Sequence, residues 1–341
     1  MKIALTADPD LLVPPKHYGG IERIVDMLAR GLVARGHEVV LFAHRDSSGE
    51  GRRLIPWPGM ASHDVGDTVK NAGCLTSEVM RGGFDVVHSF SRIAYLAPIL
   101  PLSIPKIMTY QREISRRSVR WGHTLSRGTL SFTAISEWMM RDVRGIGQWA
   151  LVPNGVPLDI YNFSQNVEPD APLVFLGRIE EIKGPHLAIE IAKRTGRRLI
   201  IAGNIPPEKK DWVDANVLPH VDGTQIRYTG TVDDAQKNEL LGSASAFLMP
   251  ILWEEPFGIV MAEAMACGVP VLGLRRGAVP EVVQDGVTGF VRDTVDELVA
   301  ATLQLDSLDR GKCRVRVETQ YSADAVVDGY LSVYRTRLRK N

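Results

Sequence analysis

The chain has 341 residues, enough for two domains, and its 40 basic and 40 acidic residues cancel. A neutral total argues against general nucleic-acid binding, so no nucleic-acid partner is expected. The three cysteines show no C-x-x-C spacing, which indicates reduced structural thiols. We find no signal peptide and no apolar run near the ~18 residues that a membrane span requires, and therefore expect a soluble, cytoplasmic protein.

The first predicted elements are a strand at residues 2–7, a helix that ends at Gly36 and a strand at residues 37–43. The helix is indicated by apolar side chains at helical spacing, namely Ile21, Ile24, Val25, Leu28 and Leu32. Such a β-α-β unit places Gly19 and Gly20 where the strand has ended and the helix begins. Free backbone amides lie there, and glycine lets a phosphate approach them closely. The alternative is a flexible loop before a helix.

Strand and helix patterns alternate along the whole chain, which favours α/β layers with parallel sheets over a β-sandwich or a helical bundle. A polar, proline-bearing interval without periodicity lies between Pro153 and Pro172 and indicates a linker. We therefore predict two doubly wound, Rossmann-like domains that face a cleft. Because ligands of such sheets bind beyond the carboxyl ends of the strands, both domains should present loops to that cleft.

Two cations follow the strand predicted at residues 173–176. Gly177 ends this strand and Pro185 suits the first turn of the next helix, so Arg178 and Lys183 lie in the loop between them. Arginine binds phosphate oxygens in pairs and lysine acts as a point charge, and together they suit a diphosphate. The alternative for each residue is a solvated surface charge.

Two glutamates lie eight residues apart in a segment that starts as a loop and becomes a helix, a length of roughly 12 Å, about the reach of a nucleotide sugar. If Glu263 binds the ribose hydroxyls and Glu255 faces the sugar, the diphosphate falls near the amides of Phe257, Gly258 and Ile259. The alternative has Glu255 as a favourable first-turn charge and Glu263 facing solvent. Because Glu263 stands among small apolar residues, where an unpaired carboxylate is costly, we expect it to have a partner.

Five segments are together highly specific: YGGIE near the N-terminus, VPNGV at the crossover, FLGRIEEIKG, EEPFGIVMAEAMACGVPV with its E-x7-E spacing, and GAVPEVVQDGVTGFV. Through them the chain resembles the retaining glycosyltransferases of family GT4, which have the GT-B fold, over nearly its whole length. The resemblance implies a nucleotide-diphosphate sugar as donor, with Gly20 near its phosphate or sugar and Arg178 and Lys183 on the diphosphate. It also implies that Glu255 and the following amides hold the sugar and that Glu263 holds the ribose.

In GT-B enzymes the last helix crosses back onto the first domain. The resemblance therefore implies an acceptor-side domain of residues 1–155 and 322–341 and a nucleotide-sugar-binding domain of residues 156–321. An amphipathic crossover helix is predicted from the apolar residues Val326, Val327, Tyr330, Leu331 and Tyr334. The segment YTGTV, which contains Gly230 and Val232, is expected to contact the donor base through its backbone.

The usual mechanism proposed for this family is a front-face reaction without a protein nucleophile, in which the leaving phosphate helps to deprotonate the acceptor. Arg178 and Lys183 would then stabilise the departing diphosphate in place of a metal, so no metal and no other cofactor is expected. The segment DPD, Asp8 to Asp10, matches the D-x-D metal signature of transferases with the other major fold and is the strongest motif against this interpretation. Two such aspartates also arise easily by chance, and we expect Asp8 and Asp10 to lie on a loop at the rim of the cleft, where they form local hydrogen bonds or meet the acceptor.

The acceptor side departs from the family pattern. The family often shows H-x-H after the fourth strand, and here His88 is followed by Phe90 at the second position. A further common T-x-H appears as Thr109-Tyr110-Gln111. His88 is a candidate catalytic residue, with a packed histidine at a strand end as the alternative. The acceptor is expected to be a small molecule, a glycan or a lipid-linked compound.

The segment 111–127 contains five arginines and a single acid, with Trp121 and Leu125 among them. In relatives that act on lipid acceptors, a basic amphipathic segment of the first domain binds anionic membrane. A peripheral contact between Arg112–Arg127 and the inner face of the membrane is therefore a hypothesis, with a solvated basic helix face as the alternative.

Two other functions remain open at this point. A nucleotide-sugar epimerase of related fold also carries paired phosphate-binding cations, although the E-x7-E element favours the transferase. A protein that binds nucleotide sugars without turnover is the second alternative, and the missing histidines favour it.

Overall fold

The computed structural model describes residues 1–15 and 19–339 and divides the chain into two compact units. Unit 1 comprises Met1–Asn154 and Ala323–Asn341, and unit 2 comprises Gly155–Ser322. These limits differ from the expected domains at Gly155 and Ser322, which fall in unit 2. Each unit is built on one parallel sheet with helices packed around it.

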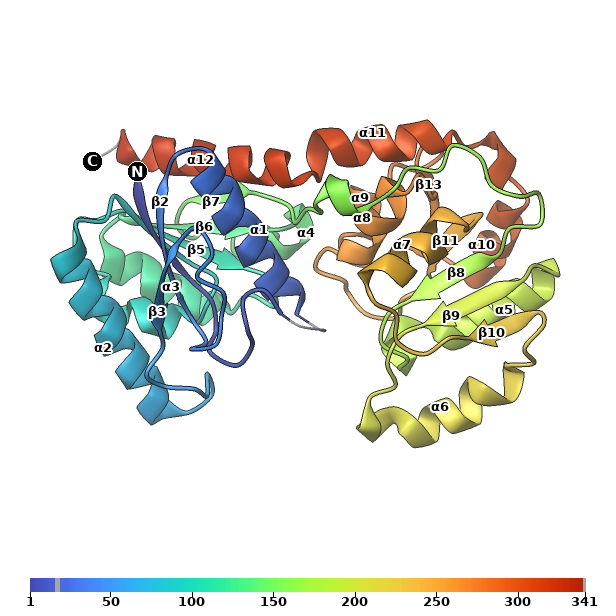
Figure 1. The fold of residues 1–341 in the computed structure, drawn as a ribbon, viewed down its shortest axis with the longest axis horizontal. Coiled ribbons are helices and arrows are strands. Elements are labelled where there is room, and N and C mark those ends of the chain that lie inside the picture. The colour runs from blue at the N-terminus through green and yellow to red at the C-terminus, as the bar shows by residue number, and fades with distance from the viewer. Residues whose placement is uncertain (16–18, 340–341) are drawn as a thin grey trace. The chain divides into compact units, whose positions relative to one another are not determined.

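The sheet of unit 1 has seven parallel strands in the order β3-β2-β1-β4-β5-β6-β7. Figure 1 draws this unit in blue to green, apart from the last helix of the chain, which is red. The strands are β1 Lys2–Thr6, β2 Glu38–Ala43, β3 Arg53–Pro56, β4 Val86–Ser89, β5 Lys106–Tyr110, β6 Leu130–Ala134 and β7 Trp149–Leu151. The central strands are almost wholly buried, as expected of a parallel sheet covered by helices on both faces. The strand order reverses between β1 and β4, and such a switch point is where open α/β sheets bind ligands.

The helices of unit 1 are α1 Gly20–Ala34, α2 Val65–Gly82, α3 Arg116–Ser126, α4 Glu137–Met140 and α12 Ala323–Leu338, with a 3-10 segment at Ile93–Ile99. The predicted end of the first helix is confirmed, because Gly36 follows α1 with a φ of 78°. Asp64 caps the start of helix α2, because its side chain accepts a hydrogen bond from the amide of Asp67, and Gly83 follows the helix in the left-handed conformation.

Helix α12 is the last helix of the chain and belongs to unit 1. The five residues of its predicted apolar face are all buried, which confirms the amphipathic helix. Its packing against α1 is close, because a Cβ atom on Gly31 would lie 2.4 Å from Cγ2 of Val327. A side chain at position 31 would therefore push the two helices apart.

The sheet of unit 2 has six parallel strands in the order β10-β9-β8-β11-β12-β13. The strands are β8 Leu173–Leu176, β9 Leu199–Ala202, β10 Ile226–Tyr228, β11 Ala246–Met249, β12 Val271–Leu274 and β13 Gly289–Arg292. The order reverses between β8 and β11, so the loops that follow these two strands meet at the switch point of this unit.

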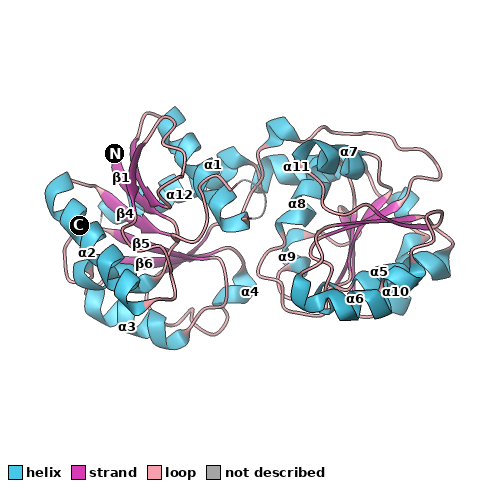
Figure 2. Ribbon diagram, turned by 60° about the horizontal axis from the view of Figure 1, so that its bottom comes forward, coloured by secondary structure: helices cyan, strands magenta, loops and turns pink. Residues whose placement is uncertain are grey.

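The helices of unit 2 are α5 Pro185–Thr195, α6 Lys210–Asn216, α7 Asp234–Gly242, α8 Ile259–Ala266, α9 Val279–Val282, α10 Val295–Thr302 and α11 Arg310–Gln320. Short 3-10 segments lie at Leu158–Ile160, Glu181–Lys183, Pro207–Lys209, Leu218–His220 and Leu305–Ser307. Figure 2 shows α5, α6 and α10 on one face of the sheet and α7, α8 and α11 on the other. The prediction of two doubly wound parallel sheets is confirmed.

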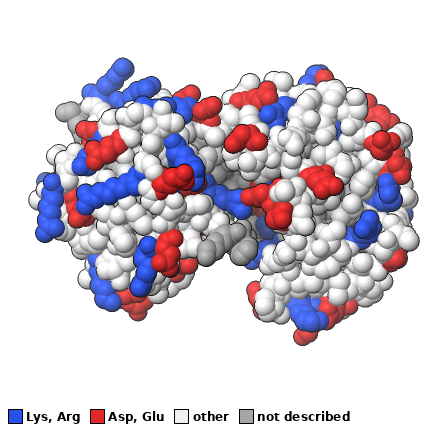
Figure 3. All heavy atoms as spheres, in the orientation of Figure 1, with Lys and Arg blue, Asp and Glu red and all other residues white. Residues whose placement is uncertain are grey.

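The surface has no dominant sign of charge. Figure 3 shows basic and acidic side chains intermixed on the face drawn, consistent with their equal numbers in the sequence.

Cys74, Cys267 and Cys313 are free thiols, and burial raises the pKa of Cys267 and of Cys313 to about 12. Among the helices of residues 1–15 and 19–339, none is long and apolar enough to cross a membrane.

Candidate active site

The loops that follow β8 and β11 bring two of the predicted site residues together at the switch point of unit 2. Nζ of Lys183, from the first loop, lies 2.8 Å from Oε2 of Glu255, from the second. The same oxygen accepts a hydrogen bond of 3.0 Å from Nε1 of Trp253, and the indole ring lies 4.4 Å from Nζ of Lys183. Lys183 is thus held by a carboxylate and an aromatic face at once.

The backbone joins these two loops as well. The amide of Leu252 donates to the carbonyl of Ile182 over 2.8 Å. Gly184 has a φ of 77°, and a Cβ atom there would lie 2.0 Å from the carbonyl oxygen of Pro250. A side chain at position 184 would separate the loops, so the KG pair places Lys183 against the β11 loop by close approach.

Arg178 lies in the β8 loop and pairs with a residue that the sequence analysis missed. Its Nη2 lies 2.8 Å from Oε1 of Glu180, whose side chain is only 6% exposed, whereas the side chain of Arg178 is 38% exposed. A guanidinium group carries five donors, so one ion pair leaves it able to bind further oxygen atoms.

Glu263, on α8, has the partner that the sequence analysis expected. Its Oε1 accepts hydrogen bonds of 2.7 Å from the hydroxyl of Tyr161 and of 2.7 Å from Nζ of Lys237 on α7. The carboxylate is nearly buried, and Lys237 also lies 5.4 Å from the ring of Tyr161. Both contacts use Oε1, so the second carboxylate oxygen takes part in neither.

The N-terminus of α8 lies between the two glutamates. Gly258 adopts a φ of 75°, which favours glycine, and a Cβ atom there would lie 2.8 Å from Cε of Met261. Phe257 is buried, with its ring 5.4 Å from that of Tyr321. Within the described part of the chain, the amides of Phe257, Gly258 and Ile259 donate to no acceptor. Such amides at a helix N-terminus suit an anion.

The start of the segment GAVPEVVQDGVTGFV holds the loop of Glu255 in place. The amide of Ala278 donates to the carbonyl of Glu255 over 2.8 Å, and the amide of Gly277 donates to Oε2 of Glu254 over 2.5 Å. A Cβ atom on Gly277 would lie 2.3 Å from the carbonyl oxygen of Glu255. This glycine therefore sets the position of the Glu255 loop.

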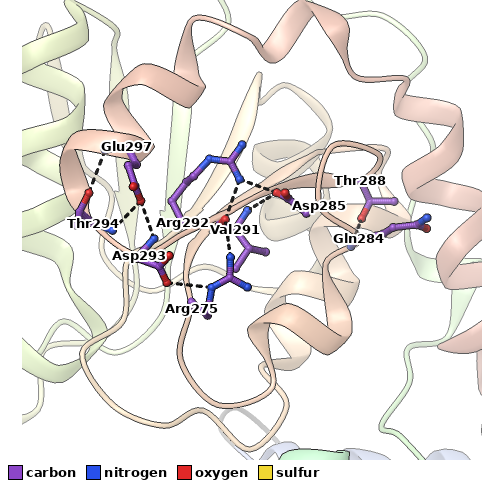
Figure 4. Close-up of polar contacts among 9 residues, drawn as sticks. All are labelled: Arg275, Gln284, Asp285, Thr288, Val291, Arg292, Asp293, Thr294 and Glu297. Carbon is purple, nitrogen blue, oxygen red and sulfur yellow. Dashed lines mark hydrogen bonds and ion pairs between the residues drawn. The ribbon is translucent and has the colours of Figure 1, made fainter.

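Polar contacts hold the end of that segment and the residues beside it (Figure 4). Oδ1 of Asp285 accepts from the amide of Val291 over 2.9 Å and from Nη1 of Arg292 over 2.7 Å. Arg275 pairs with Asp293 at 2.9 Å, and Thr294 caps α10 through the amide of Glu297. These polar side chains support the turn around β13, so the segment contributes to the site through its glycine.

Gly230 and Val232 follow β10, two strands away from the switch point. Gly230 has a φ of 76° and its carbonyl accepts a hydrogen bond of 2.8 Å from the amide of Gly203. Nothing lies within 4 Å of the position that a Cβ atom on Gly230 would take. Their role in binding the base stays a prediction.

Gly19 and Gly20 begin α1 in unit 1. Gly19 has a φ of 153°, and a Cβ atom on it would lie 2.7 Å from Cβ of Pro15 and 2.9 Å from Oε2 of Glu22. Gly20 is the first helical residue. The residues before them in the motif, His17 and Tyr18, lie outside the described residues.

For His88 the geometry favours the packed alternative. The side chain is fully buried, Nδ1 lies 2.6 Å from the hydroxyl of Tyr334 and Nε2 lies 2.7 Å from the hydroxyl of Thr109. Burial lowers the pKa of His88 to about 3, so the ring is neutral. Phe90 lies against it, with ring centroids 4.4 Å apart. Both nitrogens are thus engaged by unit 1 itself.

The basic segment 112–127 includes helix α3. Trp121 and Leu125 are each 41% exposed. They line a hollow of about 440 Å³ together with Arg116, Arg117, Arg120 and Thr124. This arrangement places apolar and cationic side chains on one face, as a membrane-surface helix would.

Two protein-family models match this chain. The model described as glycosyl transferases group 1 matches residues 160–318, and the model described as Glycosyltransferase Family 4 matches residues 18–160. A phosphatidyl-myo-inositol mannosyltransferase of Mycobacterium leprae is 26% identical, and the match covers 93% of each chain.

Solved structures show the same fold. AviGT4, a glycosyltransferase involved in avilamycin A biosynthesis, is 24% identical, with a TM-score of 0.75 over 100% of this chain and 98% of the other. Anabaena Alr3699/HepE, in complex with UDP and glucose, is 15% identical, with a TM-score of 0.73 over 98% of this chain and 100% of the other. The chain therefore belongs to the family 4 glycosyltransferases, which have the GT-B fold, and it is an enzyme of that class.

Proposed function

We propose that this enzyme transfers a sugar from a nucleotide-diphosphate sugar to an acceptor hydroxyl with retention of configuration. The observation that carries the proposal is the cluster at the β8/β11 switch point. There Lys183 contacts both Glu255 and Trp253, and the amides of residues 257–259 follow directly along the chain.

The donor would lie along the segment from Glu255 to Glu263. In this orientation Arg178, Lys183 and the α8 amides bind the diphosphate, Glu255 faces the sugar and Glu263 binds the ribose. Lys237 and Tyr161 support this assignment, because they hold one oxygen of Glu263 and so orient the carboxylate.

The contact between Lys183 and Glu255 has a consequence for donor binding. A bound diphosphate is a second anion beside Lys183. The positive charge of Lys183 is then shared between the diphosphate and the carboxylate of Glu255. The carboxylate, still held by Nε1 of Trp253, can then accept hydrogen bonds from sugar hydroxyls. Through Lys183, binding of the diphosphate thereby frees Glu255 to bind the sugar.

We further propose that the reaction needs no metal. Arg178 and Lys183 supply two positive charges at the position of the leaving diphosphate, and the leaving phosphate helps to deprotonate the acceptor. The competing hypothesis is a metal held by Asp8 and Asp10, which lie in unit 1 after β1.

The HepE structure, a complex with UDP and glucose, supports the donor hypothesis. The backbone after β10, including Gly230 and Val232, would contact the base. A backbone contact does not distinguish uracil from other bases, so the donor is proposed by class.

The acceptor is proposed to be a small molecule, a glycan or a lipid-linked compound. The face of α3 with Trp121, Leu125 and its arginines suits an anionic membrane surface. The relative from Mycobacterium leprae is a phosphatidyl-myo-inositol mannosyltransferase, which supports the same hypothesis. Co-sedimentation with anionic but not with neutral vesicles, reversed by moderate salt, would support it, and binding that ignores lipid charge would exclude it.

Incubation with UDP-, GDP-, ADP- and dTDP-sugars, with and without acceptors, tests the proposed function. Release of nucleoside diphosphate is the expected result. Interconversion of the sugars would instead indicate an epimerase. Saturable binding without any product would indicate a protein that binds nucleotide sugars without turnover.

A further inference from the structure

Glu180 is a buried acid in the loop that carries both cations of the proposed donor site. The loop follows β8, with Arg178 two residues before Glu180 and Lys183 three residues after it. Glu180 is 4% exposed, whereas the next residue, Glu181, is exposed. Glutamate is almost never fully buried without a partner, because removing its charge from water is costly. The position of this acid therefore calls for an explanation.

The charge of Glu180 is balanced by Arg178. Oε1 of Glu180 lies 2.8 Å from Nη2 of Arg178, and within residues 1–15 and 19–339 no other cationic side chain pairs with this carboxylate. The two partners differ in burial, since the side chain of Glu180 is 6% exposed and that of Arg178 is 38% exposed. The acid is thus held inside the protein, and the cation is the half of the pair that a ligand can reach.

The contact is an ion pair without a hydrogen bond. Oε1 of Glu180 is shielded from solvent and has no hydrogen-bond donor among the described residues. Because about 90% of buried polar groups in native proteins have a hydrogen-bond partner, this oxygen is an exception. The ion pair therefore uses none of the five N–H donors of the guanidinium group, and all five remain available to phosphate oxygens.

The backbone of Glu180 contributes to the same geometry. Its carbonyl accepts a hydrogen bond of 3.1 Å from the amide of Lys183, which closes a 3-10 turn. The preceding residue, Ile179, is fully buried, and its amide donates to the carbonyl of Asn204 over 2.9 Å. The carboxylate thus starts from an anchored backbone and is a fixed charge in the loop.

We propose that Glu180 is a positioning residue, which holds the guanidinium group of Arg178 beside the leaving diphosphate. Attraction to a fixed carboxylate restricts the rotamers of a long, partly exposed side chain and leaves its donors free. Such preorganisation lowers the barrier when charge develops on the leaving group. The charge of Glu180 also repels the diphosphate, so we expect the residue to affect turnover more than affinity. This inference rests on the proposed function.

The test is a double-mutant cycle of Glu180→Gln and Arg178→Ala, with Glu181→Gln as the control. The control removes the same charge from the neighbouring, exposed position. Release of nucleoside diphosphate from UDP-, GDP-, ADP- and dTDP-glucose is measured for wild type, and the donor that reacts fastest is used for every variant. Calorimetry measures the affinity of each variant for the matching nucleoside diphosphate.

We expect Glu180→Gln to lower kcat about fivefold or more and to change the affinity for nucleoside diphosphate by less than about twofold. Glu181→Gln should keep both quantities within about twofold of wild type. In the Arg178→Ala background, Glu180→Gln should change the remaining rate by less than about twofold, because a positioning residue has no effect once its partner is absent.

The other outcomes overturn the inference and can be told apart. If wild type releases nucleoside diphosphate and Glu180→Gln matches Glu181→Gln, Glu180 takes no part and the proposed function stands. An equal loss of rate with and without Arg178 would show a structural role that is independent of the cation. A loss of affinity with unchanged kcat would show that Glu180 acts on binding alone. If wild type releases none from any donor, the proposed function fails and the inference falls with it.

A second variant covers the case in which Glu180→Gln does not fold. Glu180→Asp keeps the charge but moves it away from Arg178 by the length of one methylene group. It should lower kcat in the wild-type background and leave the rate of Arg178→Ala within about twofold. Equal effects in the two backgrounds, or no effect in either, would overturn the inference.

Discussion

At the scale of single residues, Lys183 is the side chain on which the proposed donor site depends. Its ammonium group contacts the carboxylate of Glu255 and the aromatic face of Trp253. The next residue, Gly184, packs closely against the neighbouring loop. These contacts hold a flexible side chain in one place before the donor arrives. A preorganised cation costs less reorganisation when charge develops on a leaving group.

We therefore expect Lys183→Ala and Arg178→Ala each to slow turnover at least tenfold, because one charge-stabilising contact contributes about 3 kcal/mol in the transition state. Lys210→Ala and Arg198→Ala are matched controls, since both residues are exposed and paired with aspartates on the surface. Steady-state kinetics and a thermal unfolding curve for each variant make the comparison. Rates near wild type in both active-site variants would remove the diphosphate assignment.

The two glutamates should give different phenotypes. Glu263→Ala should raise KM and weaken binding of the free nucleoside diphosphate, because ribose contacts are similar in the ground and transition states. It should also lower the free energy of unfolding by about 1–3 kcal/mol, because it leaves Lys237 without its buried partner. Glu255→Ala should lower kcat with little effect on nucleoside diphosphate affinity. Exchanged phenotypes would reverse the proposed orientation of the donor.

At the scale of elements, α12 is tied to the unit 1 sheet by polar contacts as well as by its apolar face. The hydroxyl of Tyr334 meets Nδ1 of His88, and Thr109 connects the other nitrogen of that ring to the hydroxyl of Thr133 at 2.5 Å. These groups are fully buried, so each would be costly without its partner. The side chain that the sequence marked as a catalytic candidate thus contributes to anchoring a helix.

The buried, neutral ring of His88 predicts that the free energy of unfolding falls in acid. Burial lowers the pKa of His88 to about 3, whereas an exposed histidine has a pKa of about 6.5. Between these values the unfolded chain binds a proton that the folded chain does not, so the free energy of unfolding should fall by about 1.4 kcal/mol for each pH unit below 6.5. Urea unfolding at several pH values measures the slope. It should be shallower in His88→Asn and unchanged in His63→Asn, an exposed control, and equal slopes in all three proteins would contradict the assignment.

At the scale of the whole molecule, the proposed role of Arg178 and Lys183 predicts that the enzyme is active without metal ions. Activity should survive EDTA, because Arg178 and Lys183 already neutralise the leaving diphosphate. Asp8→Asn should not create or abolish a metal requirement, whatever its effect on rate. A preparation that loses activity on chelation and regains it with Mn²⁺ would show that a metal carries the leaving-group charge.

The fold was predictable because its signals are local. Apolar runs and helical spacing decide where β1, α1 and α12 form, and each of these was predicted from neighbouring residues. The contacts within the site are different, since Lys183 and Glu255 are 72 residues apart and Tyr161 and Glu263 are 102 apart. No periodicity indicates which loops meet. Trp253 could have been found as an aromatic residue beside Glu255, whereas Lys237 gives no signal of its own in the sequence.

The placement of α12 in unit 1 has a consequence for how the protein is made. A ribosome completes all of unit 2 before it begins residues 323–339, although unit 1 starts the chain. Until α12 emerges, the face of α1 that carries Gly31 and the imidazole of His88 lack their cover. Domains generally fold as units during synthesis, from the N-terminal one onward. Here that order is inverted: the half that is synthesised first is finished last, and the whole of unit 2 is translated while unit 1 is still incomplete.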